Sequence, residues 1–213
     1  PSAPRALVVA AAAWAAYATC DSRINLQEEG YIGMFRFGPD FQEHMEAEGS
    51  PRGFDGPCWA DFLWLDIDRE NAVDLALEDT RKLVSTLGKC WQISPEDLLL
   101  FFSGSKGFHL GIPTSLWSPS PTHYFNAACQ HTAGKIAAET QIEVDGRIYD
   151  KQRIFRAPNS KHAKTGLHKR RITHQQMEDL TIDQIRELAE APAAFDYHAP
   201  PLALPTDPVF PAT

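Results

Sequence analysis

The heptapeptide FLWLDID, residues 62–68, alternates its side chains with the period of a β-strand. In such a strand the aliphatic side chains face the core, and Asp66 and Asp68 share the opposite face. Two carboxylates so close repel each other unless a divalent cation lies between them, and hard oxygen ligands favour Mg²⁺ or Mn²⁺. The alternative is that Asp68 caps a helix beginning near Arg69, which leaves Asp66 unexplained.

A second motif, SGSKGFHLGIP at residues 103–113, follows the apolar strand LLLFF. Its glycines let the backbone bend tightly and approach a ligand closely. The turn also offers hydroxyl, ammonium and imidazole donors of the kind that a polyphosphate needs. The spacing of its glycines and lysine differs from that of a Walker loop. The alternative is an ordinary Ser-Gly-Ser turn with a structural histidine.

The third feature is a basic segment, residues 147–171, with nine Lys or Arg and one acid, Asp150. The segment carries +8 although the whole chain carries −8, so it attracts phosphates to one face of an acidic protein. Apolar residues between 148 and 155 predict that the charges lie on a folded strand. Asp150 placed beside Asp66 and Asp68 would complete a three-carboxylate metal cage; alternatively it is a plain salt-bridge partner.

In this order, the three motifs resemble the archaeo-eukaryotic primase superfamily. The shared pattern is a strand ending in Asp-x-Asp, then Ser-Gly-x-Lys-Gly-x-His, then an Asp leading to Arg-x-x-Arg-x-Pro-x-Ser, within residues 30–172. The superfamily includes primase small subunits, plasmid and phage primase-polymerases and the polymerase domain of bacterial end-joining ligases. The resemblance implies an α/β (α+β) fold, with an N-terminal αβ module, a lobe like an RNA-recognition motif, and the active site in the cleft between them.

The resemblance also implies roles for particular residues. The catalytic metal ligands for one or two Mg²⁺ or Mn²⁺ ions would be Asp66, Asp68 and Asp150. The nucleotide-binding residues would be Ser103, Ser105, Lys106, His109, Arg153, Arg156, Ser160, His162 and Lys164. We expect nucleic acid to be bound by Lys161, Lys169, Arg170 and Arg171. The stretch RAPNSKHAKTG departs from the family pattern at Ala157 and Asn159, where the family often has Leu and Gly.

The implied activity is that of a DNA primase-polymerase, a nucleotidyltransferase that makes or extends primers on single-stranded DNA during replication. Its partners would be nucleoside triphosphates, a template, a primer and a fused or separate helicase. Three alternatives stay open: an end-joining repair polymerase, a non-catalytic nucleic-acid-binding module, and a metal-dependent nuclease or phosphohydrolase. Tyr31, Phe35 and Phe37 are candidates for the residue beside the sugar 2′ position, and nothing in the sequence ranks them.

Apolar periodicity predicts strands at Ile32–Phe37, Phe62–Ile67, Leu98–Phe102, Phe108–Ile112 and Ile148–Phe155. It predicts helices at 69–87, ended by Gly88, at 122–140, and from a Thr181–Gln184 capping box to Pro192. The first helix would bury one stripe: Val73, Ala76, Leu77, Thr80, Leu83, Val84 and Leu87. We expect a catalytic domain at 1–191 and a Pro-rich linker at 192–213.

The chain has four cysteines without the paired spacing of a zinc site or a disulfide framework: Cys20, Cys58, Cys90 and Cys129. We therefore expect free thiols in a cytoplasmic protein, with no structural zinc. The apolar run Leu7–Ala18 is too short to span a membrane, so we interpret it as a buried helix and expect no membrane association.

Overall fold

The structure, a computed structural model, describes residues 9–117 and 119–196. Its centre is a four-stranded antiparallel sheet in the order β4-β6-β5-β8. These strands are β4 (Phe62–Asp68), β5 (Leu99–Phe102), β6 (Gly107–Pro113) and β8 (Arg170–Ile172). The protein is thus of mixed α and β class, and FLWLDID is β4, as predicted.

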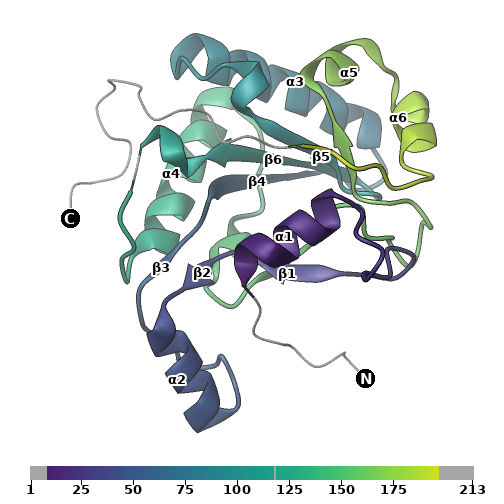
Figure 1. Cartoon of the computed structure of the whole chain (residues 1–213). Helices are drawn as coiled ribbons and strands as arrows, with labels where there is room; N and C mark the ends of the chain where they lie inside the picture. The colour runs from purple at the N-terminus through teal and green to yellow at the C-terminus, as the bar shows by residue number, and fades with distance from the viewer. Residues whose placement is uncertain (1–8, 118, 197–213) are drawn as a thin grey trace.

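Helices cover both faces of this sheet (Figure 1). α3 (Val73–Cys90) and α4 (Phe125–Thr140) lie on one face, and α1 (Ala10–Ala18) lies on the other. The seven residues of α3 that the sequence placed on one stripe are its buried residues. Burial of an amphipathic face therefore fixes α3 against the strands.

Two short antiparallel ribbons flank the sheet. β1 (Tyr31–Gly33) pairs with β7 (Ile154–Arg156), and β2 (Arg36–Phe37) pairs with β3 (Cys58–Trp59). α2 (Pro39–Glu48) stands away from the main body (Figure 1). The remaining elements are α5 (His174–Asp179), α6 (Ile182–Leu188) and three 3₁₀ turns at Pro95–Asp97, Thr114–Leu116 and Gly146–Tyr149.

The strand predicted at Ile148–Phe155 is wrong over its first six residues. A 3₁₀ turn ends at Tyr149, and strand structure begins only at Ile154. Ile148 and Tyr149 are both buried, and consecutive side chains of a strand would face opposite sides. The Tyr149 hydroxyl donates a hydrogen bond to the Trp64 carbonyl oxygen, 2.5 Å away, which holds this turn against β4.

The predicted helix boundaries are confirmed in part. The Thr181 hydroxyl and the Gln184 side chain form the expected capping box of α6. Gly88 does not end α3, because the helix continues to Cys90 and the left-handed residue after it is Gln92, with φ 55°. The prediction considered only glycine as the left-handed residue that follows the helix, although other residues also adopt this conformation.

The N-terminal helix is a surface helix and not a buried one. Ala18 is buried and Trp14 packs on Phe62 and Trp64, but most other α1 positions are partly or fully exposed. The predicted start of the helix, Leu7, lies outside the described residues. Within the described ranges, no helix is both long and apolar enough to cross a membrane.

The chain packs on the sheet beyond the expected linker boundary at Pro192. The Phe195 ring lies 5.5 Å from that of Phe101, and the Phe195 N–H donates to the Ala18 carbonyl oxygen at 3.0 Å. The folded part therefore extends at least to Phe195. The remaining tail, residues 197–213, lies outside the described residues.

Asn159 joins three segments of this fold. It is fully buried with φ 59°, a left-handed conformation that asparagine tolerates better than most residues. Its amide group donates to the carbonyl oxygens of Tyr17 and Ala193 and accepts from the Ala193 N–H, at 3.0–3.1 Å. A glycine at this position would supply the same backbone conformation without these hydrogen bonds.

We expect Asn159→Ala to lower the free energy of unfolding by about 2–4 kcal/mol, because it leaves buried backbone groups unpaired and strains the left-handed position. Urea unfolding measures this change. Asn159→Gly should cost less, since glycine keeps the backbone conformation and loses only the hydrogen bonds. Wild-type stability in the alanine variant would contradict this assignment.

Candidate active site

Asp66 and Asp68 lie on one face of β4, opposite the buried Leu63, Leu65 and Ile67, as the alternation predicts. Their cross-strand partners on β6 are His109 and Gly107. The alternative role of Asp68 as a helix cap is excluded, because α3 begins at Val73 and its N-cap residue is Ala72.

The 103–107 turn brings its lysine to β4. Gly104 has φ 82°, and a side chain at Gly107 would collide with the Ile67 carbonyl oxygen and with Asp68. The Ser103 hydroxyl oxygen accepts hydrogen bonds from the N–H groups of Ser105 and Gly107, both at 3.3 Å. This tight turn places the Lys106 ammonium 3.2 Å from an Asp68 carboxylate oxygen.

His109 is buried beside Asp66. Its Nε2 lies 3.5 Å from Asp66 Oδ1, and its ring packs 4.2 Å from that of Phe155. Burial, reinforced by the positive charges of Lys169 and Arg156, holds the pKa of His109 well below its ordinary value. The imidazole is therefore neutral at physiological pH and offers one donor and one acceptor.

Asp66 is the most perturbed acid of the site. Burial, followed by the negative charges of Asp68 and Asp145, raises its pKa from 3.8 to about 7 against the opposing effect of Lys169 and Lys106. Its Oδ1 is buried and has no hydrogen-bond partner in the described part of the chain. Such a group is destabilising as an anion unless a cation is supplied.

The further acid whose charge acts on Asp66 besides Asp68 is Asp145, whereas the role of Asp150 as a metal ligand stays a prediction. Asp150 is exposed, and its carboxylate accepts a hydrogen bond from the Gln152 N–H at 2.8 Å. The Asp145 N–H donates to the Asp66 carbonyl oxygen at 3.2 Å, and Arg147 binds the Asp145 carboxylate through two nitrogens. Because the strand expected from Ile148 is a 3₁₀ turn, the chain meets β4 five residues earlier than expected.

Residues from all three motifs line one cleft of about 190 Å³. Tyr31 of β1, which belongs to none of the three motifs, also lines this cleft. The lining residues are Tyr31, Asp66, Asp68, Ser103, Ser105, Lys106, His109, Ile148, Arg153, Ile154, Phe155, Arg156 and His162. The cleft is smaller than a pocket that encloses a whole drug-sized ligand, so only part of a nucleotide could be enclosed.

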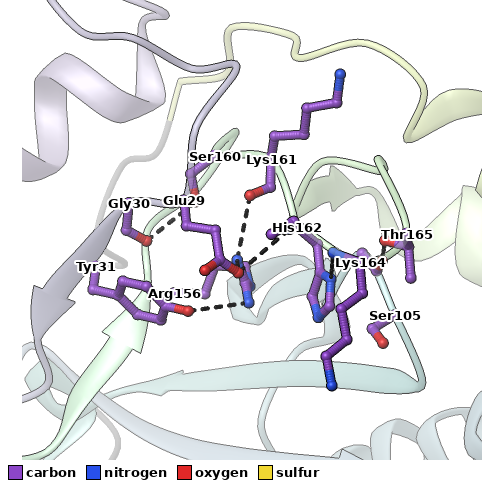
Figure 2. Close-up of polar contacts among 12 residues, drawn as sticks. Glu29, Gly30, Tyr31, Ser105, Arg156, Ser160, Lys161, His162, Lys164 and Thr165 are labelled. Atoms are coloured by element: carbon purple, nitrogen blue, oxygen red, sulfur yellow. Dashed lines mark hydrogen bonds and ion pairs between the residues drawn. The ribbon is translucent and has the colours of Figure 1, made fainter. Parts of the chain in front are cut away.

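The loop after β7 closes one side of this cleft. The Thr165 hydroxyl donates to the Gly104 carbonyl oxygen at 2.5 Å, which ties the loop to the 103–107 turn. His162 and Lys164 lie beside Ser105 at this junction (Figure 2). The two segments predicted to bind phosphate are therefore neighbours in space.

Several predicted ligand-binding residues have other roles. Ser160 is fully buried, and its hydroxyl donates to the carbonyl oxygens of Ala157 and Gly30. The Lys161 ammonium donates to the Gln27 side chain at 3.2 Å, and Lys164 is exposed near the cleft without lining it. Ser160 therefore supports the loop and does not reach a ligand.

Lys169 is the clearest correction, because a residue expected to bind nucleic acid is fully buried. Its ammonium donates to the Arg156 carbonyl oxygen at 2.8 Å and lies 4.4–5.2 Å from the ring centroids of Phe155, Phe101 and Trp64. Burial holds its pKa well below the ordinary value, while the negative charge of Asp66 opposes that shift. Lys169 thus positions Arg156 and acts electrostatically on the carboxylates.

Arg170 and Arg171, which were also expected to bind nucleic acid, lie on β8. Arg170 is half-buried, and burial lowers its pKa. Arg171 is also half-buried and donates to the Leu100 carbonyl oxygen at 3.4 Å. Both are of intermediate exposure, and the nucleic-acid role expected for them stays a prediction.

The structure separates the three candidates for a residue beside the sugar. Phe35 is buried in the core, and Phe37 stacks on Phe41 at 4.2 Å beside α2. Tyr31 is 45% exposed and lines the cleft, with the Arg156 guanidinium 5.2 Å from its ring centroid. Only Tyr31 of the three is placed to touch a ligand.

Among the described residues, no three His, Cys, Asp or Glu side chains form a ready-made metal cluster. The three acids are instead paired with cations or buried: Asp68 with Lys106, Asp145 with Arg147, and Asp66 beside the neutral His109. Comparison of the sequence with models of protein families and with curated proteins found no match.

The raised pKa of Asp66 predicts a pH-dependent stability. Folded Asp66 keeps its proton to about pH 7, whereas the unfolded chain loses it near pH 4, so stability falls as pH rises between these values. We expect Asp66→Asn to raise the free energy of unfolding by roughly 1–3 kcal/mol at pH 8 with EDTA, and by much less at pH 5.

Urea unfolding at the two pH values measures this difference. Asp150→Asn is the matched control, since Asp150 is exposed, and it should change stability little at either pH. An Asp66→Asn protein less stable than wild type at pH 8 would show that the carboxylate is not under electrostatic strain.

Proposed function

We propose that this protein is a metal-dependent nucleotidyltransferase of the archaeo-eukaryotic primase type, which joins nucleotides on a single-stranded DNA template. The observation that carries the proposal is the shared cleft. Asp66 with Asp68, the 103–109 segment and the 153–162 segment are far apart in the sequence, yet all line it. Carboxylates on one side and cationic donors on the other are what a metal-bound triphosphate requires.

One feature of the site fits a divalent cation, and it is the buried carboxylate of Asp66. Asp66 Oδ1 is buried and has no hydrogen-bond partner among the residues that the structure describes, and a cation would remove the cost of ionising this carboxyl. Asp66 and Asp68 would hold Mg²⁺ or Mn²⁺, with Asp145 in the place expected for Asp150. Such an ion, when bound, lowers the pKa of a primer 3′ hydroxyl and neutralises phosphate charge.

The chain's own donors would bind the triphosphate. Lys106 and Arg156 offer an ammonium and a guanidinium at the cleft, and Arg153 is exposed at its edge. His162 lines the same wall, and burial followed by the charge of Arg156 lowers its pKa. A neutral His162 would donate a single hydrogen bond to a phosphate oxygen, whereas the two charged groups orient the polyphosphate.

The base and sugar would lie outside the enclosed part of the cleft, against Tyr31. Its exposed ring offers a stacking surface at the open end. Within the proposal, Tyr31 is the residue beside the sugar, and the exposed Lys164 with the half-buried Lys161 are the basic residues left for a nucleic-acid strand. A helicase, fused or separate, is the partner that primer synthesis would need.

The topology supports the proposed family. The order β4-α3-β5-β6-α4, with β4, β6 and β5 adjacent and both helices on one face, follows the split βαβ pattern expected of the lobe like an RNA-recognition motif. The β1–β7 ribbon lies across from the carboxylate strand and supplies the opposite wall of the cleft.

Synthesis assays test the proposal. The protein is incubated with single-stranded DNA, Mn²⁺ or Mg²⁺ and labelled nucleotides, with and without a primer, and products are resolved by size. We expect Asp66→Asn, Asp68→Asn and Asp145→Asn each to reduce synthesis at least a hundredfold, since each removes negative charge that would hold the cation. Asp150→Asn should retain activity within about twofold, because its carboxylate is exposed and, unlike that of Asp145, is not one of the charges that act on Asp66.

Products made without a primer would identify a primase, and extension of a supplied primer alone would identify a polymerase. Strand cleavage or phosphate release without longer products would instead favour a hydrolase. Absence of synthesis, with DNA binding intact in wild type and variants, would favour a binding module. Loss of activity in Asp150→Asn with activity retained in Asp145→Asn would restore the sequence-based ligand assignment.

A further inference from the structure

An acidic side chain from outside the cleft pairs with Arg156, a residue of the basic wall of the cleft. Glu29 Oε1 accepts hydrogen bonds from Arg156 Nη1 at 3.1 Å and from the Ala163 N–H at 3.3 Å (Figure 2). A guanidinium together with a backbone N–H is a common donor set for a phosphate oxygen. The carboxylate therefore lies where an anionic ligand of this wall would place an oxygen.

The two side chains of the Glu29–Arg156 ion pair differ in their exposure to solvent. The Arg156 side chain is 12% exposed, so its guanidinium is fixed, and it also contacts the Tyr31 hydroxyl and the Lys161 carbonyl oxygen. The Glu29 side chain is 37% exposed and can turn into solvent without breaking any apolar packing that the structure shows. The donors are therefore preorganised, and the acceptor is the movable partner.

The charges around Glu29 favour its ionised form. Burial alone would raise the pKa of Glu29, but hydrogen bonds from the Ala163 N–H and Arg156 outweigh this effect and hold the pKa below its ordinary value. Glu29 thus competes as a full negative charge for donors that face the cleft. A ligand must offer more negative charge than one carboxylate to displace it.

We propose that Glu29 is an internal competitor that occupies a phosphate subsite formed by Arg156 and the Ala163 N–H, and that it makes the cleft select polyphosphates over single phosphate groups. This inference deepens the proposed function, since it names how the same cleft distinguishes its ligands. A triphosphate reaches several donors at once and displaces Glu29. A monophosphate would replace one anion by another with little gain.

Binding of inorganic pyrophosphate and inorganic phosphate, measured calorimetrically with EDTA present, tests the inference without requiring synthesis. We expect Glu29→Gln to raise phosphate affinity roughly tenfold and pyrophosphate affinity only about threefold, because the competing charge is gone and the preference for polyphosphate falls with it. The neighbouring Glu28→Gln is the matched control, since it changes net charge equally at an exposed position. It should shift either affinity less than twofold.

A second variant locates the effect. In an Arg156→Ala background, Glu29→Gln should no longer raise affinity, because the shared donor is absent. Unchanged or weaker pyrophosphate binding in Glu29→Gln, a gain that persists without Arg156, an equal gain in Glu28→Gln, or no anion binding by any protein would each overturn the inference. Increased pyrophosphate binding without DNA synthesis would overturn only the proposed function, and synthesis without the increase would overturn only this inference.

Discussion

The buried carboxylate of Asp66 is the constraint on which the site depends. It lies in the middle of a sheet strand, its Oδ1 has no hydrogen-bond partner in the described structure, and its pKa is raised to about 7. A fold that places an acid there must surround it with positive charge or leave it protonated. Lys106 and the buried Lys169 lower the pKa of Asp66 from two different segments, but by less than burial and the neighbouring acids raise it.

The two faces of β4 have different roles, one in the core and one in the candidate site. Leu63, Leu65 and Ile67 pack under α3 and α4 and hold the sheet together, so the opposite face can carry charged groups without loss of the core. Because β4 is hydrogen bonded along its whole length to β6, Asp66 and Asp68 are fixed relative to His109. The position of the carboxylates is therefore set by a rigid sheet, whereas the phosphate-type donors come mainly from loops tied to it.

Sequence patterns correctly predicted those structural features that depend on residues close together in the chain. The alternation of FLWLDID, the buried stripe of α3 and the Thr181 capping box depend on neighbouring residues, and each is confirmed. Which further acid lies near Asp66 depended on where a distant segment meets β4, and with a 3₁₀ turn in place of a strand it is Asp145 whose charge acts on Asp66. Lys169 was assigned to the surface because composition reports charge but not burial. An Asp-Gly pair at residues 145–146 was the one available turn signal, and it lay just outside the basic segment.

Several charges in and around the cleft are already paired before any ligand arrives. Asp68 is bound to Lys106, Asp145 to Arg147, and Glu29 to Arg156. A cation binding alone would have to separate Lys106 from Asp68 and leave the lysine unpaired, and a polyphosphate binding alone would leave the carboxylates unpaired. A metal-bound triphosphate satisfies both groups at once, because the ion takes the carboxylates while the phosphates take the released cations. Under the proposed function, this exchange of partners makes the metal and the triphosphate bind cooperatively, since each removes a cost that the other would otherwise meet.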